Sequence, residues 1–338
     1  MPSFRKPVAG LTCLFALATA GCSAGSGAGT DAAREPATSG TTAAGSSGTS
    51  YAPYVSATDA AATDSSGSPA AYNLAFVISD GSGCTPKWNG EQALTDPAVT
   101  ARVAKLRKGG AVRVSFGGAS GKELASTCGS ASALAAAYGR ALDAAGATRA
   151  DFDIEGDELT DTASVALRSE AIALLQKERR DLEVSFTLPV MPSGLDADSL
   201  ALLESTNRYD VQVATVDLMT MNYGESYTGD MGDYALTSAK AAHAQLKKVF
   251  GLSDAGAWQG MALTSMIGVN DITAETFTLS DAAQVRTFAE QKGIAWVSMW
   301  ATFRDQQCEK GKSTRDDAAT NCSGVQQSSG AFGRALAG

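Results

Sequence analysis

The sequence contains one histidine, His243, among its 338 residues. A mechanism that needs a histidine pair is therefore excluded, as is a metal site with several histidine ligands, and carboxylates are left to carry acid–base chemistry. Charged residues are scarce at 19%, and 36 acidic residues outnumber 27 basic ones. The net charge of -9 argues against nucleic acid as a partner, because binding polyphosphate requires clustered basic side chains.

Apolar runs long enough to cross a bilayer are also missing near the start of the chain. The stretch over residues 8–20 is too short for this, and two basic residues precede it, so residues 1–21 are predicted to be a secretory signal. The stretch ends in Leu-Ala-Thr-Ala-Gly-Cys, which resembles a bacterial lipobox and makes Cys22 a candidate lipid anchor. Thr19 departs from the aliphatic residue preferred there, so ordinary secretion with cleavage nearby stays open. We expect a secreted or cell-surface bacterial protein whose membrane contact, if any, is through Cys22.

No Cys-x-x-Cys pair occurs, which argues against a zinc site. Residues 22–49 are rich in Ser, Gly, Ala and Thr and are predicted to form a flexible tether. Four cysteines follow the tether, and in an exported protein they predict two disulfides. Three pairings are open, of which the favoured one joins neighbours in sequence, Cys84 with Cys128 and Cys308 with Cys322.

Short apolar or β-branched runs alternate with alanine-rich stretches of helical spacing from about residue 50 to the end. Strands are predicted over 52–56, 73–79, 111–116, 149–154, 183–188, 213–221, 260–266 and 294–300. Helices are predicted over 98–108, 131–145, 164–179, 236–250 and 280–292. This alternation favours a parallel sheet with helical crossovers, and residues 50–338 fit a single (β/α)₈ TIM barrel better than two domains.

Three carboxylates, Asp151, Asp153 and Glu155, alternate with apolar residues in one predicted strand. Side chains two residues apart in a strand share a face, so in a barrel all three acids line the interior and lead to the catalytic rim. Their mutual repulsion is expected to raise at least one pKa, which keeps a proton available near neutrality. Glu155, nearest the mouth, is the candidate proton donor. An acidic strand end that faces solvent or binds a cation is the simpler alternative.

The segment Asp151-Phe152-Asp153-Ile154-Glu155 resembles the end of the DxxDxDxE signature of family 18 glycoside hydrolases, the chitinases and their relatives. Three further segments are similar to elements of this family and occur in the same order, namely Ser115-Phe116-Gly117-Gly118, Met219-Thr220-Met221-Asn222-Tyr223-Gly224 and Ser298-Met299-Trp300. The resemblance is closest to compact bacterial secreted chitinases. These lack an α+β insertion before the last strand, and residues 266–294 are too few to hold one.

The resemblance implies a retaining hydrolysis of β-1,4 bonds between N-acetylglucosamine units, with chitin or chitooligosaccharides as substrate. In this scheme the substrate's own acetamido group acts as the nucleophile, and no metal or other cofactor is needed. Glu155 donates the proton, Asp153 orients the acetamido group, and Asp151 holds the proton left behind. Tyr223 completes the implied catalytic set by hydrogen bonding to the acetamido oxygen. A monomer is expected.

The other implied positions bind substrate or shape the backbone. Trp300 stacks under the sugar, Met221 packs along the pocket wall, and Asn222 stands where many relatives carry Asp. Ser115, Gly117 and Gly118 are expected to shape the backbone near the site, since glycine permits close approach. Without the motif, Trp300 and Met221 would be read as barrel filling.

The sequence departs from the family pattern at Thr148, which occupies the position of the first signature Asp and puts the tuning of Asp151 in question. Arg304 and Asp305 follow the last predicted strand and are expected either to pair or to line a subsite. Two alternative functions stay open. One is an endo-β-N-acetylglucosaminidase acting on the N-glycan core, and the other is a non-catalytic barrel that binds chitooligosaccharides. The presence of Glu155 argues against the latter.

Overall fold

The computed structural model describes residues 48–311 and 315–338, which belong to one compact unit, Ser46–Gly338. The predicted signal at 1–21, Cys22 and nearly all of the tether lie outside the described residues. Among the helices of the described part, none is both long and apolar enough to cross a membrane.

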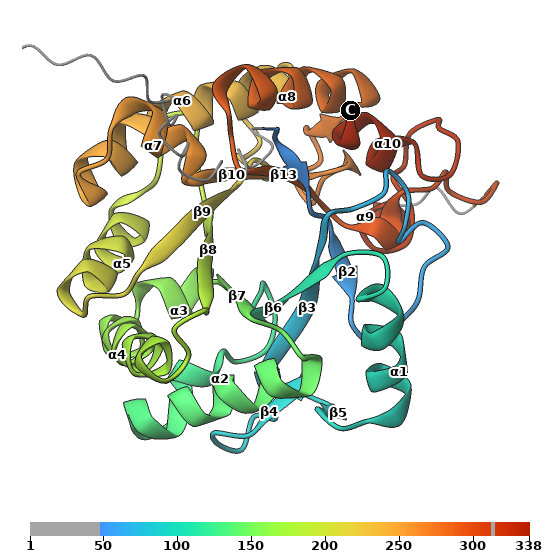
Figure 1. The fold of residues 1–338 in the computed structure, drawn as a ribbon. Helices are drawn as coiled ribbons and strands as arrows, with labels where there is room; N and C mark the ends of the chain where they lie inside the picture. Colours follow the sequence, from blue (N-terminus) through green and yellow to red (C-terminus); the bar gives the residue numbers. More distant parts are fainter. Residues whose placement is uncertain (1–47, 312–314) are drawn as a thin grey trace, which may run out of the picture. The chain divides into compact units, whose positions relative to one another are not determined.

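A closed barrel of parallel strands forms the centre of the unit (Figure 1). Its strands are β1 Ser50–Tyr51, β2 Tyr54–Ser56, β3 Ala71–Ser79, β6 Ala111–Gly117, β7 Arg149–Asp153, β8 Glu183–Pro189, β9 Val213–Met219, β10 Met261–Met266 and β13 Trp296–Trp300. Each pairs in parallel with its neighbours, so all carboxyl ends meet at one rim, where TIM-barrel enzymes place their active sites. The predicted fold class is therefore confirmed.

The first strand closes the barrel in two halves. β1 pairs with β13 through Tyr51 and Val297, whereas β2 pairs with β3 through Tyr54 and Asn73. Pro53 lies between the halves. Because proline has no N–H to donate, the ladder is interrupted at this residue and the strand changes partner across it.

Helices surround the barrel on its outer side (Figure 1). They are α1 Pro97–Leu106, α2 Ala131–Ala145, α3 Gly156–Thr160, α4 Thr162–Glu178, α5 Ala197–Arg208, α6 Met231–Phe250, α7 Asp254–Gln259, α8 Leu279–Lys292, α9 Arg315–Thr320 and α10 Ala331–Ala337, with 3₁₀ turns η1 Leu124–Ser126 and η2 Thr302–Arg304. The five predicted helices are present, with one boundary shifted by five residues. That helix begins at Met231 instead of Leu236, because the Asp230 side chain accepts a hydrogen bond from Asp233 N and caps its first turn.

An aromatic cluster joins the barrel to the helical layer. The Phe152 ring lies 5.3 Å from the Phe116 ring, 5.0 Å from the Tyr138 ring and 5.4 Å from the Phe186 ring, measured between centroids. Tyr138 belongs to α2, so Phe152 points outward from β7 as the alternation predicted. The acids on either side of it therefore point inward.

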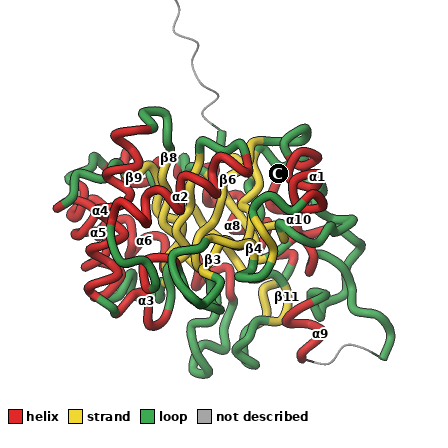
Figure 2. Tube along the Cα trace, turned by 90° about the horizontal axis from the view of Figure 1, so that it is seen from below, coloured by secondary structure: helices red, strands yellow, loops and turns green. Residues whose placement is uncertain are grey.

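Small additions cover the carboxyl-terminal rim. β4 Pro86–Trp88 and β5 Gln92–Ala93 extend the sheet beside β3, and β11 Gly268–Val269 pairs with β12 Thr276–Phe277. In the side view of Figure 2, α3, β11 and α9 lie at the same lower end of the barrel. No α+β domain is inserted between β10 and β13, where the described residues form only β11, β12 and α8.

The described residues contain two disulfides. Cys84 bonds to Cys128, and Cys308 bonds to Cys322, as the sequence favoured.

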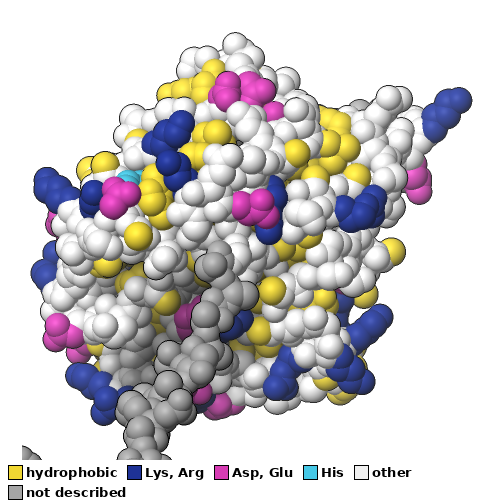
Figure 3. Space-filling view, turned by 45° about the horizontal axis from the view of Figure 1, so that its top comes forward, with side chains coloured by type: hydrophobic (Ala, Val, Ile, Leu, Met, Phe, Trp, Pro, Cys, Tyr) yellow, Lys and Arg dark blue, Asp and Glu magenta, His cyan; other side chains and the backbone are white. Residues whose placement is uncertain are grey.

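On the face shown in Figure 3, basic and acidic side chains are interspersed and do not gather into one large patch of a single sign.

Candidate active site

Asp151 lies on the inner face of β7 and is fully enclosed. Its carboxylate accepts hydrogen bonds from four hydroxyls: Tyr54 at 2.9 Å, Ser115 at 2.6 Å, Ser185 at 2.9 Å and Thr187 at 2.9 Å. These donors come from β2, β6 and β8, so three other barrel strands fix the orientation of this carboxylate. Ser115, expected to shape the backbone, thus also holds Asp151.

Thr148 has no part in this arrangement. It is exposed and stands just before β7, at the end of the strand away from the rim, where its carbonyl oxygen accepts from Glu183 N at 3.0 Å. Since the carboxylate of Asp151 is held by hydroxyls of other strands, the missing first signature Asp does not affect its support.

Asp153 and Glu155 form a hydrogen-bonded pair above Asp151. Burial raises the pKa of Asp153 well above its usual range, and the charges of Glu155, Asp151 and Asp217 raise it further. Burial also raises the pKa of Glu155 to about 7, opposed by its hydrogen bond with Asp153 and assisted by the charges of Asp271 and Glu158. At neutral pH the pair therefore retains at least one proton, which is the requirement for a general acid.

Asp217 on β9 adds a fourth acid inside the barrel. It is fully buried, and its Oδ2 accepts from the Thr264 hydroxyl at 2.7 Å and from Trp296 Nε1 at 3.4 Å. Burial raises the pKa of Asp217 to about 7. The barrel interior thus concentrates carboxyl groups beneath the pocket, and this crowding favours proton retention in the pair above.

A pocket opens at the rim over this pair. Its lining comprises Tyr54, Phe76, Ala119, Asp153, Glu155, Thr187, Met219, Met221, Asn222, Thr264, Met266, Asp271 and Trp300. The lining combines carboxyl and amide groups with methionine and aromatic side chains. Such a mixture suits a sugar, which presents hydroxyls at its edge and C–H groups on its faces.

Aromatic rings form one side of the pocket. Trp300 stacks on Phe76 with centroids 5.5 Å apart and an interplanar angle of 18°. Tyr54 and Phe303 meet the indole edge-on, at 5.8 and 5.7 Å. Packing from three sides holds the Trp300 ring in place while leaving it partly exposed, so it is a rigid apolar surface within the pocket.

Gly117 and Gly118 bring backbone and ring close together at the end of β6. Gly117 has φ +100°, and a Cβ there would lie 2.1 Å from the carbonyl oxygen of Asp153. Gly118 has φ +92°, and its Cβ would lie 2.8 Å from the Phe76 ring. Only glycine fits both positions, in agreement with their expected role of shaping the backbone.

The prediction for Tyr223 needs correction. Its side chain is buried outside the pocket, where its hydroxyl accepts from Ser238 of α6 at 3.4 Å and its ring packs against Tyr227 and Tyr234. The physical reason is Asn222, which has φ +53°. This left-handed residue breaks the strand alternation after Met221, so Met221 and Asn222 both line the pocket and the next residue turns outward.

Asp271 is a pocket residue that the sequence analysis missed. Its carboxylate accepts from Asn222 Nδ2 at 2.8 Å, while its backbone N–H donates to Asn222 Oδ1 at 3.1 Å. Asp271 lies in the turn between β11 and β12, without any strand or helix pattern around it. The only available signal was an acid shortly after a barrel strand, at the rim where loops carry function.

Arg304 and Asp305 neither pair with each other nor line the pocket, which corrects both expectations. Arg304 donates to the carbonyls of Trp300, Val269 and Ala318. Asp305 accepts from Phe332 N at 3.0 Å and Gly333 N at 2.8 Å. Both are fully buried and secure the chain after β13, the second by capping α10.

Within residues 48–311 and 315–338, no three His, Cys, Asp or Glu side chains are grouped so that they could hold a metal ion. In the pocket, Asp153 instead bonds to Glu155 and Asp271 to the Asn222 amide, while Asp151 beneath them bonds to hydroxyls.

Comparisons with known proteins connect this geometry to a group of enzymes. The chain is 33% identical over 275 residues to a probable bifunctional chitinase/lysozyme of Escherichia coli, and 31% identical over 274 residues to endochitinase 11 of Metarhizium anisopliae. Each match covers 75% of the chain, but only 31% and 52% of these relatives. The chain thus spans about a third to a half of the curated relatives it matches. No family model matches the chain.

Solved structures give broader coverage. The catalytic domain of a hyperthermophilic chitinase from Pyrococcus furiosus is 30% identical, with a TM-score of 0.74, and the match covers 85% of this chain and 93% of that domain. Catalytic-site mutants of active domain 2 of the P. furiosus chitinase, complexed with chito-oligosaccharides, align equally well at 28% identity, with a TM-score of 0.74, covering 86% of this chain and 96% of theirs. A GH18 chitinase from Pseudoalteromonas aurantia shares the fold at 14% identity, with a TM-score of 0.54, covering 75% of this chain and 94% of that one.

Proposed function

Because the chain belongs to glycoside hydrolase family 18, we propose that it is a chitinase that cleaves β-1,4 bonds between N-acetylglucosamine units with retention of configuration. The observation that carries this proposal is the Asp153–Glu155 pair in the pocket, where burial raises the pKa of Glu155 to about 7. The relatives' chitinase activity and the chito-oligosaccharides bound to the P. furiosus enzyme support the choice of substrate.

Bond cleavage begins with proton transfer from Glu155 to the glycosidic oxygen. As the bond from that oxygen to the anomeric carbon breaks, the carbonyl oxygen of the substrate's own acetamido group forms a new bond to the same carbon. The product of this step is an oxazolinium ion, and the leaving sugar departs as a neutral alcohol. No protein nucleophile is required.

Asp153 orients the acetamido group during this step. It accepts a hydrogen bond from the acetamido N–H, which aims the carbonyl oxygen at the anomeric carbon and stabilises the developing positive charge. Its Oδ1 is buried and has no hydrogen-bond partner within the described residues, so a turn of the carboxyl toward the substrate breaks no hydrogen bond at this oxygen. Asp151, held in place by four hydroxyls, keeps the proton that is left behind when Asp153 turns to the substrate as a carboxylate.

Water completes the reaction. The Glu155 carboxylate takes a proton from the water that attacks the anomeric carbon, and the oxazolinium ring opens to restore the acetamido group. Two displacements at one carbon give a product with the β configuration of the substrate. Analysis of fresh products by NMR with anomeric resolution checks this point, and an initial α-anomer would contradict it.

Trp300, Met221 and Asn222 supply the binding surface. The indole of Trp300 offers its face to the C–H groups of the sugar, and Met221 adds an apolar wall. The Asn222 amide, fixed by Asp271, adds a polar group to the lining. Tyr223 has no role in this scheme, since its hydroxyl faces α6.

The main test is Glu155→Gln. We expect hydrolysis of chitohexaose to fall by roughly 10²–10⁴-fold or more, because the general acid is lost while the shape of the pocket is kept. Binding of the oligosaccharide, measured by calorimetry, should persist. The matched control is Glu170→Gln on α4, which is exposed and should leave the rate unchanged. Near-normal turnover by the Glu155 variant would refute the assignment.

Activity of the unmodified enzyme should fall as the pH rises through about 7, because Glu155 must be protonated to act and its pKa is raised to about 7.

Turnover of colloidal chitin against release of glycans from a high-mannose glycoprotein distinguishes a chitinase from an endo-β-N-acetylglucosaminidase. Preference for the glycoprotein would favour the second enzyme class.

We also propose that residues 1–21 direct export and that Cys22 carries a lipid, which places the enzyme at or beyond the cell surface of a bacterium. We propose separately that the enzyme is a monomer. The lipobox-like run before Cys22 supports this. Mass spectrometry of the mature amino terminus tests it, and an unmodified terminus at another residue would favour ordinary secretion.

A further inference from the structure

Glu275 is a buried acid that the proposed mechanism does not use. It lies at the end of the turn between β11 and β12 and is 0% exposed. None of the ion pairs in the described part of the chain involves it. Its Oε1 accepts from the backbone N–H of Gly224 at 2.8 Å, whereas its Oε2 has no hydrogen-bond partner within the described residues. A carboxylate buried in this way depends on nearby N–H groups for its stability.

The backbone after β9 provides these N–H groups. Asn222 has φ +53° and Gly224 has φ +119°, and a bend of this kind directs successive N–H groups toward one anion. Burial raises the pKa of Glu275, and backbone hydrogen bonds from Gly224, Asn222 and Tyr223 oppose the rise, because they favour the charged form. Glu275 therefore supports the same bend that turns Tyr223 away from the pocket.

The contact between the two segments is reciprocal. Asn222 Oδ1 accepts from the backbone N–H groups of Asp271 at 3.1 Å and Ile272 at 3.4 Å, which belong to the turn that carries Glu275. Asn222 Nδ2 donates to Asp271 Oδ2 at 2.8 Å. Each segment thus places one side chain on the backbone of the other, and a shift of either segment would break hydrogen bonds in both directions.

The turn that carries Glu275 is itself held firmly. Asn270 is fully buried, and its Nδ2 donates to the carbonyl oxygens of Met266 and Gly268, both at 2.9 Å. Asn270 N donates to the carbonyl oxygen of Glu275 at 3.1 Å, and Glu275 N donates to that of Ile272 at 3.0 Å. Because Met266 ends β10, these bonds fix the position of Glu275 relative to the barrel.

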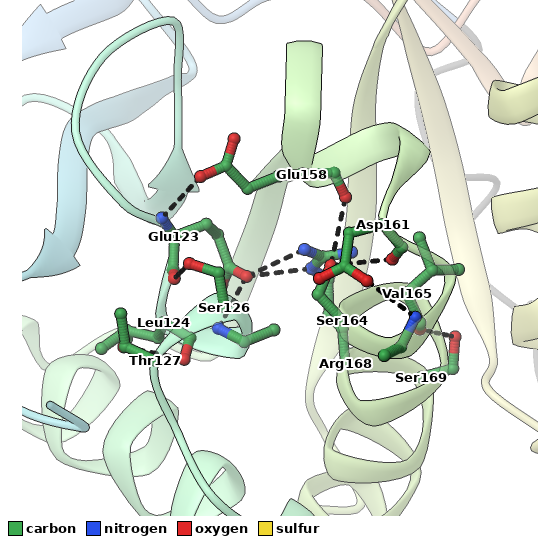
Figure 4. Close-up of polar contacts among 12 residues, drawn as sticks. Glu123, Leu124, Ser126, Thr127, Glu158, Asp161, Ser164, Val165, Arg168 and Ser169 are labelled. Carbon is green, nitrogen blue, oxygen red and sulfur yellow. Dashed lines mark hydrogen bonds and ion pairs between the residues drawn. The ribbon is translucent and has the colours of Figure 1, made fainter.

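A second buried glutamate at the rim shows what is particular to Glu275. Figure 4 shows Glu123 paired with Arg168 of α4, which donates to its Oε2 through Nε at 3.2 Å and Nη2 at 2.9 Å. The remaining bonds of this carboxylate come from a backbone N–H and a tyrosine hydroxyl. Glu158 Oε1 accepts from the backbone N–H of Glu123 at 3.4 Å. These groups lie outside the pocket lining, whereas the bonds of Glu275 reach the backbone of a lining residue.

We infer that Glu275 is a positioning residue for substrate binding, which holds Asn222 in its left-handed conformation and so keeps Asn222 and Asp271 in the pocket lining. This inference rests on the proposed function. Glu275 is not itself in the lining, so it acts through Asn222. Its hydrogen bonds reach residues 222–224 and its own turn, and not the acids of β7. Its loss should therefore weaken binding more than it slows the chemical step.

The test is Glu275→Met, which keeps the length of the side chain and removes the acceptor. With chitohexaose, KM should rise roughly 3- to 10-fold while kcat stays within about twofold, because the lost hydrogen bonds hold binding groups. Glu275→Gln keeps an acceptor for the N–H of Gly224 and should recover most of the affinity. The matched control is Asp281→Leu, a buried acid outside the lining that bonds to the backbone N–H of Thr278 at 2.6 Å. It should lower the Tm without raising KM.

A double-mutant cycle tests whether the effect passes through Asn222. In the Asn222→Ala background, Glu275→Met should change KM by less than about twofold, because the amide that Glu275 positions is already gone. An unchanged KM in the single variant Glu275→Met, full additivity in the cycle, or an equal rise in Asp281→Leu would overturn the inference.

Gly224→Ala decides the question if Glu275→Met does not fold. Its added Cβ would meet no atom within 4 Å, so the variant disfavours only the backbone conformation at φ +119°, and KM should again rise. An unchanged KM in this variant would then overturn the inference.

A further measurement does not depend on turnover. The side-chain amide signal of Asn222 in ¹⁵N NMR, assigned with Asn222→Ala, should shift in Glu275→Met and stay in place in Asp281→Leu. An unmoved signal in Glu275→Met would overturn the inference even if the enzyme is active. Absence of hydrolysis by the unmodified protein would instead overturn the proposed function, while the amide signal still tests the positioning.

Discussion

Asp151, Asp153 and Glu155 stand two residues apart on one strand and point to one side, yet their surroundings differ. Asp151 receives four hydroxyl hydrogen bonds, whereas Asp153 faces another carboxyl and has one oxygen without a partner. Glu155, at the pocket, has a pKa raised to about 7. Position along the strand therefore gives three similar groups different surroundings, and these surroundings suit their proposed roles as proton holder, orienting group and proton donor.

Single residues also decide where strand alternation stops. Strict alternation after Asp217 would turn residues 219, 221 and 223 to the same side. The left-handed backbone of Asn222 ends that pattern, which sends Tyr223 to the helical layer. The sequence carries only a weak signal for this reversal, because Asn is enriched in the left-handed conformation but also occurs in extended backbone.

Tyr223→Phe distinguishes the two placements. Since its hydroxyl contacts Ser238 and not the pocket, we expect kcat/KM within roughly twofold of the unmodified enzyme. Asn222→Ala is the comparison variant and should raise KM, because this amide lines the pocket and holds Asp271. A hundredfold or greater loss in kcat for the Tyr223 variant, with native folding, would restore the sequence-based role.

At the scale of elements, the clearest patterns predicted their strands and helices well. The helix over residues 131–145 matches α2, which starts at the Ser130 cap and ends at Gly146 in the left-handed conformation. By contrast, α5 was not assigned. Three of its five fully buried residues are Ser199, Ser205 and Thr206, so its inner face lacks the apolar periodicity on which the prediction relies.

The Glu123–Arg168 pair joins η1 to α4, and Arg168→Met tests its contribution to stability. We expect the free energy of unfolding to fall by about 3–5 kcal/mol, because a buried carboxylate loses its partner. Urea denaturation followed by circular dichroism measures this. Arg179→Met, at the end of the same helix, breaks an exposed pair with Asp143 and should cost at most about 1 kcal/mol. Equal losses in the two variants would contradict the argument.

At the scale of the molecule, the two disulfides close loops of different length. Cys84–Cys128 spans 44 residues and Cys308–Cys322 spans 14. If loop closure in the unfolded chain dominates, replacing the first pair with serine should cost about 4 kcal/mol and the second about 3 kcal/mol. Thermal unfolding of the two double variants measures the order. The reverse order would show that contacts in the folded state outweigh chain entropy.

The barrel depends on contacts between the two ends of the described chain. β1 pairs with β13 and β2 with β3, while Asp305 caps α10 beside them. The prediction of one barrel rested on the count of alternating elements, which is a local property. Closure through a first strand broken at Pro53 is a long-range property, since its two partners are separated by more than 200 residues.

The sequence by itself determined the barrel class, the three inward acids, the glycine positions and the favoured disulfide pairing, because each depends on local period, residue type or chain proximity. Only the tertiary structure decided that Tyr223 leaves the pocket, that Asp271 enters it, and that the Glu158 side chain bonds to the backbone of Glu123. Those facts depend on which loops meet at the rim and on one left-handed residue. Loop packing of this kind follows from contacts between distant segments, and no periodic pattern in the sequence records it.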